Sequence, residues 1–220
     1  MGEYYKWVNI DKKEYISPSD FDMGNKLFES SVDNNPLLNA LCTLVLNRWK
    51  NNRIIFLGDE CQIPEENKNM VLQELRKQWI EYGGIGYIEE CVYERFKNVS
   101  CLFRESEAYV KKVIDELLVD RDIFNEYGLN LDRPYEGLFE LKGSYCKYII
   151  NITKHMYISS DKFEKKKDST GEEYRVNPLP FLMAYGRTAD SNMGSWIGDI
   201  ISFSNEKPLG IDELEKELGI

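Results

Sequence analysis

The pattern of apolar and polar positions predicts β-hairpins toward both ends of the chain. In residues 4–17, two β-prone runs flank the polar residues 11–14, as in two strands joined by a turn. A similar pattern returns in residues 138–158, with a glycine-containing turn at 142–144. We therefore expect antiparallel strands near the start of the chain and again after its middle.

Helical spacing follows the first hairpin. Asn35 and Pro36 form a helix start, because asparagine caps free N–H groups and proline is tolerated at the first helical position. Apolar residues then recur every three or four positions up to Trp49. Residues 53–57 are a short apolar run before Gly58, which predicts a buried strand.

The middle of the chain is predicted to be helical over residues 65–127. Three amphipathic stripes, around 71–80, 88–96 and 109–118, have charged residues on their opposite faces. Gly83-Gly84 is typical of a helix end rather than a phosphate-binding loop, since no strand precedes it. Toward the end of the chain we expect a charged loop at 164–171, a short helix at 178–186, a strand at 196–203 and a short acidic helix at 211–218.

Two segments of the chain have related sequences. Residues 9–17 and 151–159 share six of nine positions at an offset of 142, and Asn35-Pro36-Leu37 matches Asn177-Pro178-Leu179 at the same offset. Trp49 aligns with Trp196, and Ile54-Ile55 aligns with Ile200-Ile201 after a one-residue loss. Chance similarity among hairpins is the alternative interpretation.

The repeat predicts the fold class. We expect a single α+β domain over residues 1–220, with related ββαβ blocks at 5–60 and 146–206. Each block has too few strands to be stable alone, so their strands are expected to join one mixed or antiparallel sheet. The acidic helical segment at 65–127 is then an insertion between the blocks.

Charge limits the classes of partner. The chain has 28 basic and 38 acidic residues and a net charge of −10, of which residues 61–140 contribute −7. An acidic surface repels phosphate backbones, so we expect no direct nucleic-acid binding. The acidic segment suits a basic protein partner, and simple solvation of the helices is the alternative.

The sequence also predicts the compartment of the protein and the state of its cysteines. We expect a cytoplasmic protein without membrane contact, because there is no signal-peptide pattern and no apolar run of about 20 residues. Five cysteines at wide spacing and a single histidine, His155, do not form a zinc-binding pattern, so we interpret the cysteines as reduced thiols. A Cys–His dyad has no support from spacing.

Two groups of residues are candidates for a site. Asp59, Glu60 and Asp199 stand at the ends of predicted strands, where carboxylates hold Mg²⁺ or act as acids and bases, although turns commonly contain the same residues. The second group is aromatic and polar and could line a ligand cleft or anchor a partner, or else pack the sheet faces. Its members are Tyr5, Trp7, Asn9, Tyr15, Arg187 and Trp196.

The chain resembles an uncharacterised bacterial protein family. The resemblance lies in residues 4–21 and 24–27, and continues through Gly58-Asp59-Glu60, 185–187 and 196–199. It implies one fold across most of the chain and a bacterial or phage origin, but no activity. Family members have Gly-Asp where this chain has Asn51-Asn52, so the resemblance carries no catalytic aspartate to that position.

These observations favour an interaction protein over an enzyme. The leading hypothesis is an intracellular protein that binds and blocks a partner, as immunity proteins, antitoxins and counter-defence proteins do. No P-loop, dinucleotide-binding, zinc-protease or nucleophile-elbow motif occurs. The alternatives are a metal-dependent hydrolase or nucleotide-processing enzyme, which would use Mg²⁺, and a small-ligand sensor; no cofactor is expected under the leading hypothesis.

Overall fold

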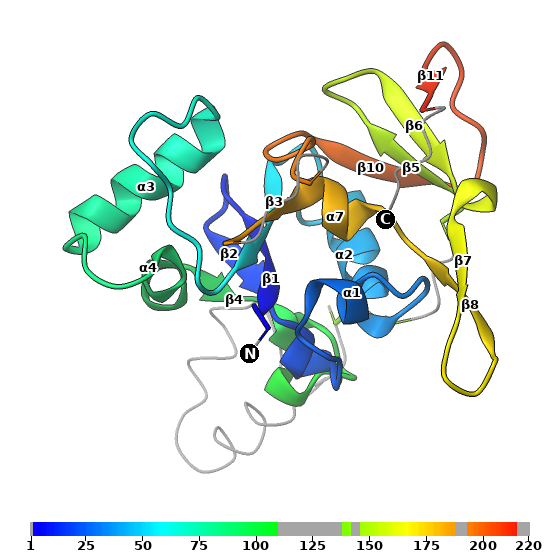
Figure 1. Ribbon diagram of the computed structural model, residues 1–220, viewed down its shortest axis with the longest axis horizontal. Coiled ribbons are helices and arrows are strands. Elements are labelled where there is room, and N and C mark those ends of the chain that lie inside the picture. Colours follow the sequence, from blue (N-terminus) through cyan, green and yellow to red (C-terminus); the bar gives the residue numbers. More distant parts are fainter. Residues whose placement is uncertain (1, 110–137, 142–145, 188–192, 215–220) are drawn as a thin grey trace.

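The fold is α+β, as predicted. A computed structural model describes residues 2–109, 138–141, 146–187 and 193–214 (Figure 1). Helices and mixed sheets alternate across the molecule in Figure 1, from the pair α3 (Met70–Tyr82) and α4 (Ile88–Arg95) on one side to a second sheet on the other. None of the described helices is long and apolar enough to cross a membrane.

The first sheet is mixed and is built around the N-terminal hairpin. Its strand order is β4 (Lys97–Asn98), β2 (Glu14–Ile16), β1 (Tyr5–Asn9), β3 (Ile54–Gly58) and β9 (Ala184–Tyr185). Strand β1 is antiparallel to both β2 and β3, whereas β4 and β9 add parallel edges. The predicted hairpin and the buried strand at 53–57 are therefore confirmed.

The second sheet is also mixed. Its order is β10 (Ile201–Ser204), β5 (Tyr148–Asn151), β6 (Met156–Ser159) and β11 (Asp212–Glu213). Strand β5 is antiparallel to β10 and β6, and β11 is parallel to β6. The helix predicted at 211–218 is wrong where the structure describes it, because residues 212–213 pair with β6; residues 215–218 lie outside the described residues.

The expectation that both blocks join one sheet holds only for β9, which adds to the first sheet, whereas β5, β6 and β10 of the second block lie in the second sheet. The two sheets are separate and touch at an isolated antiparallel bridge between Arg53 and Ile200, beside a hydrogen bond from Gly198 N to Ile54 O of 3.1 Å. A further hairpin, β7 (Glu164–Lys167) and β8 (Glu173–Val176), replaces the predicted loop at 164–171. Its turn is ordered by Asp168, whose Oδ1 accepts the backbone N–H groups of Thr170 and Glu172.

Short and long helices complete the fold. They are α1 (Leu27–Ser30), α2 (Pro36–Leu46), α7 (Leu179–Met183), and the 3-10 helices η1 (Pro18–Phe21), η2 (Ser100–Leu102) and η3 (Ser160–Lys162). Helix α2 begins as predicted, since Asn35 Oδ1 accepts the N–H of Leu38 at 2.8 Å and Pro36 occupies the first turn. Helices α3 and α4 fall in the predicted helical segment, whereas most of the stripe at 109–118 lies outside the described residues.

The hydrophobic core has two parts on opposite faces of the first sheet. Strand alternation sends Trp7 and Phe56 to one face, where they pack with α2, α7 and the second sheet. Val8 and Ile55 point to the other face, which α3 and α4 cover. Helix α2 contacts β10 and α7 contacts β3, so each helix packs on a strand from the other half of the chain (Figure 1).

The hairpins β1–β2 and β5–β6 share local geometry at the offset of 142, whereas the glycine-containing turn predicted at 142–144 lies outside the described residues. Trp7 pairs with Ile16 and Ile149 pairs with Ile158, which is the same register. Lys13 and His155 occupy corresponding turn positions with φ of 54° and 53°. Each turn is closed by an asparagine: Asn9 Oδ1 accepts the N–H of Lys12 and Asn151 Oδ1 that of Lys154, both at 2.9 Å.

The third strand of each block, β3 in the first and β10 in the second, shows that the alignment made from the sequence is shifted by one residue. Asn9 lies opposite Ile54 and Asn151 lies opposite Ile201, so Ile54 corresponds to Ile201 rather than to Ile200. Asn51 and Gly198 then correspond, and both have positive φ, of 61° and 79°. Superposition of the complete blocks 5–60 and 146–206 stays a prediction.

Candidate functional site

Five of the six predicted binding residues lie in the protein interior. They are Tyr5, Trp7, Asn9, Tyr15 and Trp196, each at most 6% exposed. The rings of Trp7 and Phe56 are 4.5 Å apart, and Asn9 Nδ2 donates to Asn52 Oδ1 at 3.1 Å. Their positions agree with the alternative interpretation given above, in which these side chains pack the faces of the sheet.

The sixth residue, Arg187, is exposed and belongs to an ion pair. Its Nη1 donates to Glu60 Oε2 at 2.9 Å, and its backbone N–H donates to Glu3 Oε1 at 2.8 Å. The side chain is 71% exposed, so the pair is screened by water and contributes little to stability. Both contacts of Arg187 join the end of β9 to acidic residues, Glu3 of the N-terminal segment and Glu60 after β3.

The three predicted metal ligands do not converge. Gly198, the neighbour of Asp199, bonds to Ile54 at one end of β3, whereas Asp59 follows the other end; five residues of strand span about 16 Å. Asp59 Oδ1 accepts the N–H of Tyr4 at 3.0 Å. Within the described residues, no three His, Cys, Asp or Glu side chains are grouped as a metal ion would require.

Asp199 is instead part of a buried polar contact. It is 8% exposed, and its Oδ2 accepts from Asn151 Nδ2 at 2.7 Å and lies 3.2 Å from Lys154 Nζ. Asn52 makes the corresponding contact with Asn9 in the first hairpin. The carboxylate of Asp199 therefore supports the turn that precedes β10.

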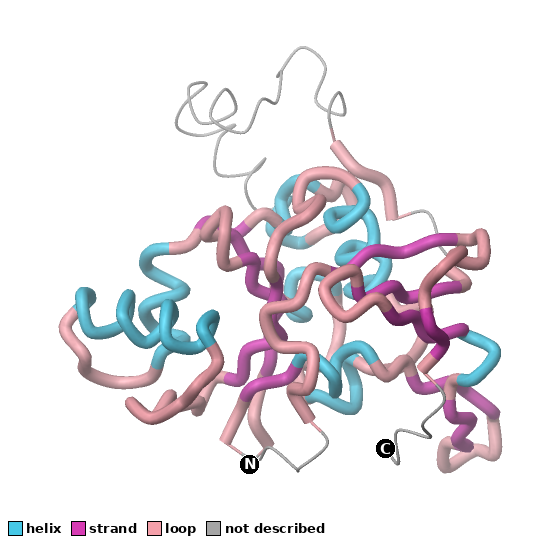
Figure 2. Tube along the Cα trace, turned by 90° about the horizontal axis from the view of Figure 1, so that it is seen from above, coloured by secondary structure: helices cyan, strands magenta, loops and turns pink. Residues whose placement is uncertain are grey.

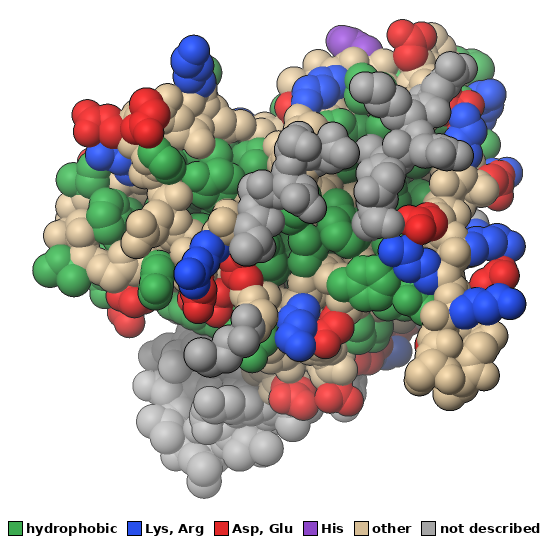
Figure 3. Space-filling view, viewed as in Figure 1, with side chains coloured by type: hydrophobic (Ala, Val, Ile, Leu, Met, Phe, Trp, Pro, Cys, Tyr) green, Lys and Arg blue, Asp and Glu red, His purple; other side chains and the backbone are tan. Residues whose placement is uncertain are grey.

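Exposed apolar side chains gather on the lobe formed by α3, α4 and their connection. Six of the eleven exposed large apolar residues described in the structure lie there: Met70, Ile80, Tyr82, Ile85, Tyr87 and Tyr93. We call the last five the α3–α4 face. Ile85 is 81% exposed. Figure 2 shows this lobe at one end of the molecule, and Figure 3 shows hydrophobic side chains on its surface with acidic side chains at its edges.

Part of this surface belongs to an apolar stripe that the sequence predicts to be buried. The apolar stripe at 71–80 includes Ile80, but α3 buries only its first half: Val71, Leu72 and Leu75 pack on the sheet. Ile80 lies where the helix extends past the sheet and is 48% exposed. The signal available in the sequence was the alternation of glycines with Ile85 and Tyr87, which places large apolar residues in a turn.

A cavity of about 350 Å³ lies beside this face, between residues 61–65 and the two helices. Its lining includes the apolar side chains of Ile63, Trp79 and Ile88. The indole Nε1 of Trp79 is buried and has no hydrogen-bond acceptor among the described residues. Arg76 also lines the cavity and pairs with the exposed Glu65 at 3.3 Å. None of the six predicted binding residues lines it.

The cysteine in this cavity, Cys61, is a buried thiol that is poorly suited to nucleophilic attack. Burial raises the pKa of the Cys61 thiol well above its usual range, and the nearby acidic side chains, Glu3 first among them, act in the same direction. A neutral buried thiol is a poor attacking group, since the thiolate is the reactive form. The cavity is therefore suited to holding a group rather than to reacting with it.

A buried lysine attaches the lobe to the first sheet. Lys6 of β1 is 2% exposed and forms an ion pair with Glu89 of α4. Its Nζ lies 3.2 Å from the centre of the Tyr93 ring and 5.5 Å from that of Tyr15. Burial lowers the pKa of Lys6, and Glu89 opposes that shift. The ion pair therefore adds a buried polar contact to the apolar packing of Ile88 and Val92, which also holds α4 on the first sheet.

No protein-family model matches the chain, and no curated protein or solved structure matches it. The case for a function accordingly rests on the surfaces and cavities of the described residues.

Proposed function

We propose that the protein binds another protein through the α3–α4 face and thereby blocks it. The observation that carries this proposal is Ile85, an 81% exposed isoleucine directly before Gly86, which lines the 350 Å³ cavity. Burying one such side chain contributes about 1.5–3 kcal/mol. Tyrosines such as Tyr82 and Tyr87 are enriched among residues that dominate binding energy.

The charge of the lobe supports a basic partner. Residues 59–95 contain nine acidic and four basic side chains, a net charge of −5. Complementary charge increases the association rate and excludes acidic competitors. The partner is therefore a protein whose contact surface carries Lys or Arg around an apolar side chain that enters the cavity.

Site-specific photo-crosslinking tests the proposal in cells that produce the protein. A photoreactive amino acid at position 85 is expected to give one dominant adduct with a basic protein, identified by mass spectrometry. The matched control is position 209, because Leu209 is 92% exposed but lies outside the lobe. Purified partner is then titrated against wild type and Ile85→Glu, and affinity is expected to fall at least about tenfold, or about 1.4 kcal/mol.

Two results would contradict it. Equal adducts at positions 85 and 209 would indicate nonspecific contact. Binding of the purified partner that is unchanged by Ile85→Glu would place the interface elsewhere.

The cavity also favours a second function, the binding of a small ligand. A volume of about 350 Å³ is within the range of ligand sites, and Arg76 with the unpaired N–H of Trp79 suits an apolar carboxylate. Thermal-shift titration with benzoate and indole-3-acetate, in wild type and Arg76→Gln, measures this directly. A saturable rise in melting temperature that Arg76→Gln removes would favour a sensor. No shift in melting temperature would argue against ligand binding and favour occupation of the cavity by a side chain of the protein partner.

A further inference from the structure

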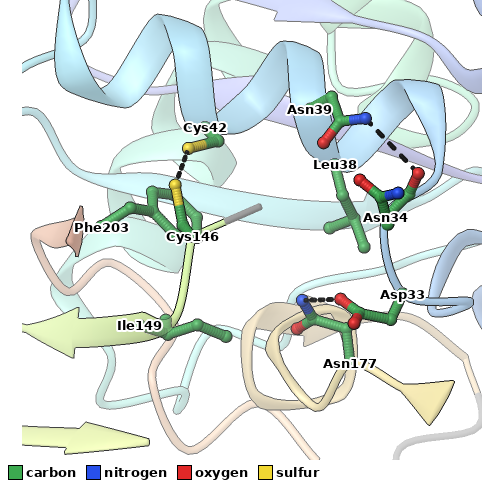
Figure 4. Close-up of a pocket in the computed structure, with 9 residues that line it drawn as sticks. All are labelled: Asp33, Asn34, Leu38, Asn39, Cys42, Cys146, Ile149, Asn177 and Phe203. Carbon is green, nitrogen blue, oxygen red and sulfur yellow. Dashed lines mark hydrogen bonds between the residues drawn. The ribbon is translucent and has the colours of Figure 1, made fainter. Parts of the chain in front are cut away.

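Two cysteines from distant parts of the chain meet at the interface between α2 and the second sheet. Cys42 of α2 and Cys146, just before β5, are 104 positions apart, and their Sγ atoms are separated by 2.7 Å (Figure 4). The side chains point toward each other, and both line a small cavity of about 20 Å³, room for a single water molecule.

The separation is close to that of a covalent bond. A disulfide has an S–S distance of about 2.05 Å, so about 0.65 Å of movement would join the two atoms. Because Cys146 lies between the undescribed residues 142–145 and the start of β5, it belongs to a connection and not to a strand. Because the separation is short, small rotations of the two side chains are the main movement required.

The two sulfur atoms have different environments. Cys42 is 3% exposed, whereas Cys146 is partly exposed and can meet a reagent from solvent. The hydrogen bond from Cys42 lowers the pKa of Cys146 despite its partial burial. Burial raises the pKa of Cys61 and of Cys91. Cys146 is thus the better attacking thiol of this pair, and Cys42 is placed to resolve.

We propose that Cys42 and Cys146 are a redox modification site that forms a reversible disulfide by exchange with a small disulfide. The Cys146 thiolate attacks one sulfur of the small disulfide, forms a mixed disulfide and releases one thiolate. Cys42 then loses its proton to solvent and attacks the Cys146 sulfur, releasing the second small thiolate. Two protein thiols become one disulfide, and the small disulfide is reduced to two thiols.

The bridge would close a loop of 104 residues that includes β3 and the whole α3–α4 lobe. Closing a loop of this length restricts the unfolded chain and raises the melting temperature, by roughly 10 °C for a protein of this size. The modification would therefore stabilise the folded protein without changing any residue on the lobe surface.

The test equilibrates the folded, full-length protein with reduced and oxidised glutathione at several ratios, followed by alkylation and non-reducing peptide mapping. A single Cys42–Cys146 bridge is expected. Cys42→Ser should accumulate a glutathione adduct at Cys146, whereas Cys146→Ser should leave the buried Cys42 unmodified. Cys101→Ser is the matched control and should retain the bridge; near-UV circular dichroism establishes that each variant is folded.

Three results of this experiment would contradict the proposal. The proposal is overturned if oxidised glutathione leaves both cysteines open to alkylation in the wild type, or if the bridge joins any other pair. It is also overturned, in its order of events, if Cys146→Ser acquires an adduct at Cys42 as quickly as Cys42→Ser does at Cys146.

Discussion

The ion pair between Lys6 and Glu89 gives a prediction that can be worked out in magnitude. Glu89→Gln removes the negative charge but keeps the size of the side chain, so the ammonium group of Lys6 remains buried without its partner. Two unit charges about 4 Å apart attract by about 4 kcal/mol at an effective dielectric constant of 20. Removing one member of a buried pair typically costs about 3–5 kcal/mol.

Proton release sets an upper limit on this cost. Lys6 can release its proton instead of staying charged, and neutralising an ordinary lysine, of pKa about 10.4, at pH 7 costs about 5 kcal/mol at about 1.36 kcal/mol per pH unit. The cation–π contact with Tyr93 remains and favours the charged form. We therefore expect Glu89→Gln to lower the free energy of unfolding by about 3–5 kcal/mol, and Lys6→Met by less, since Glu89 is more exposed than Lys6.

Urea denaturation followed by tryptophan fluorescence measures these values between pH 7 and 10. A lysine whose pKa is lowered on folding binds fewer protons in the native than in the unfolded state, so stability rises with pH between the two pKa values. Relative to Lys6→Met, Glu89→Gln should therefore gain stability as pH rises from 7 to 10. A loss under about 1 kcal/mol in Glu89→Gln would refute the buried pair. So would a loss in the double variant, Lys6→Met with Glu89→Gln, that equals the sum of the two single losses.

Three further predictions concern the scaffold, each checked by urea denaturation at pH 7. Glu14→Ala should cost about 3 kcal/mol, because Glu14 Oε2 accepts from the buried Trp49 Nε1 at 2.8 Å, and Glu14→Gln should cost less; equal losses would contradict the role of the acceptor. Gly198→Ala should cost about 2 kcal/mol or more, since φ is 79° and a Cβ would lie 2.4 Å from Val71 Cγ2, whereas the exposed Asn51→Ala should cost about 1 kcal/mol. Asp199→Asn should stay within about 1 kcal/mol of wild type because an amide oxygen can still accept from Asn151; a larger loss would show that the charge itself stabilises the turn.

Local signals in the sequence were sufficient for much of the fold. The N-terminal hairpin, the cap at Asn35 and the strand at 53–57 each depend on residues close in the chain, and each is present in the structure. The hairpin at 164–176 was missed because Glu164 and Lys165–167 have low β propensity. It is supported by cross-strand contacts such as Lys165 Nζ to Glu173 Oε1 at 2.9 Å, which the sequence order does not reveal.

The residues of the candidate site were harder to predict because exposure depends on distant elements. Lys6 stands between Tyr5 and Trp7 in a strand, and alternation alone would place it on a solvated face. Helix α4 covers that face and supplies Glu89 and Tyr93, so Lys6 is buried. Conversely, Ile80 continues a helical apolar stripe but extends beyond the sheet that buries the rest of that stripe.

The turns before β3 and β10 have a structural role that does not require catalytic residues. In both, an asparagine of the preceding hairpin donates to the side chain before the strand, Asn52 in one case and Asp199 in the other. The same contact is made with an amide and with a carboxylate, so it does not require the charge of Asp199. Glycine is needed at 198 because α3 packs closely there, whereas Asn51 is exposed. Packing explains these strand-end residues without catalysis, and the exposed α3–α4 face is the stronger place to seek a function.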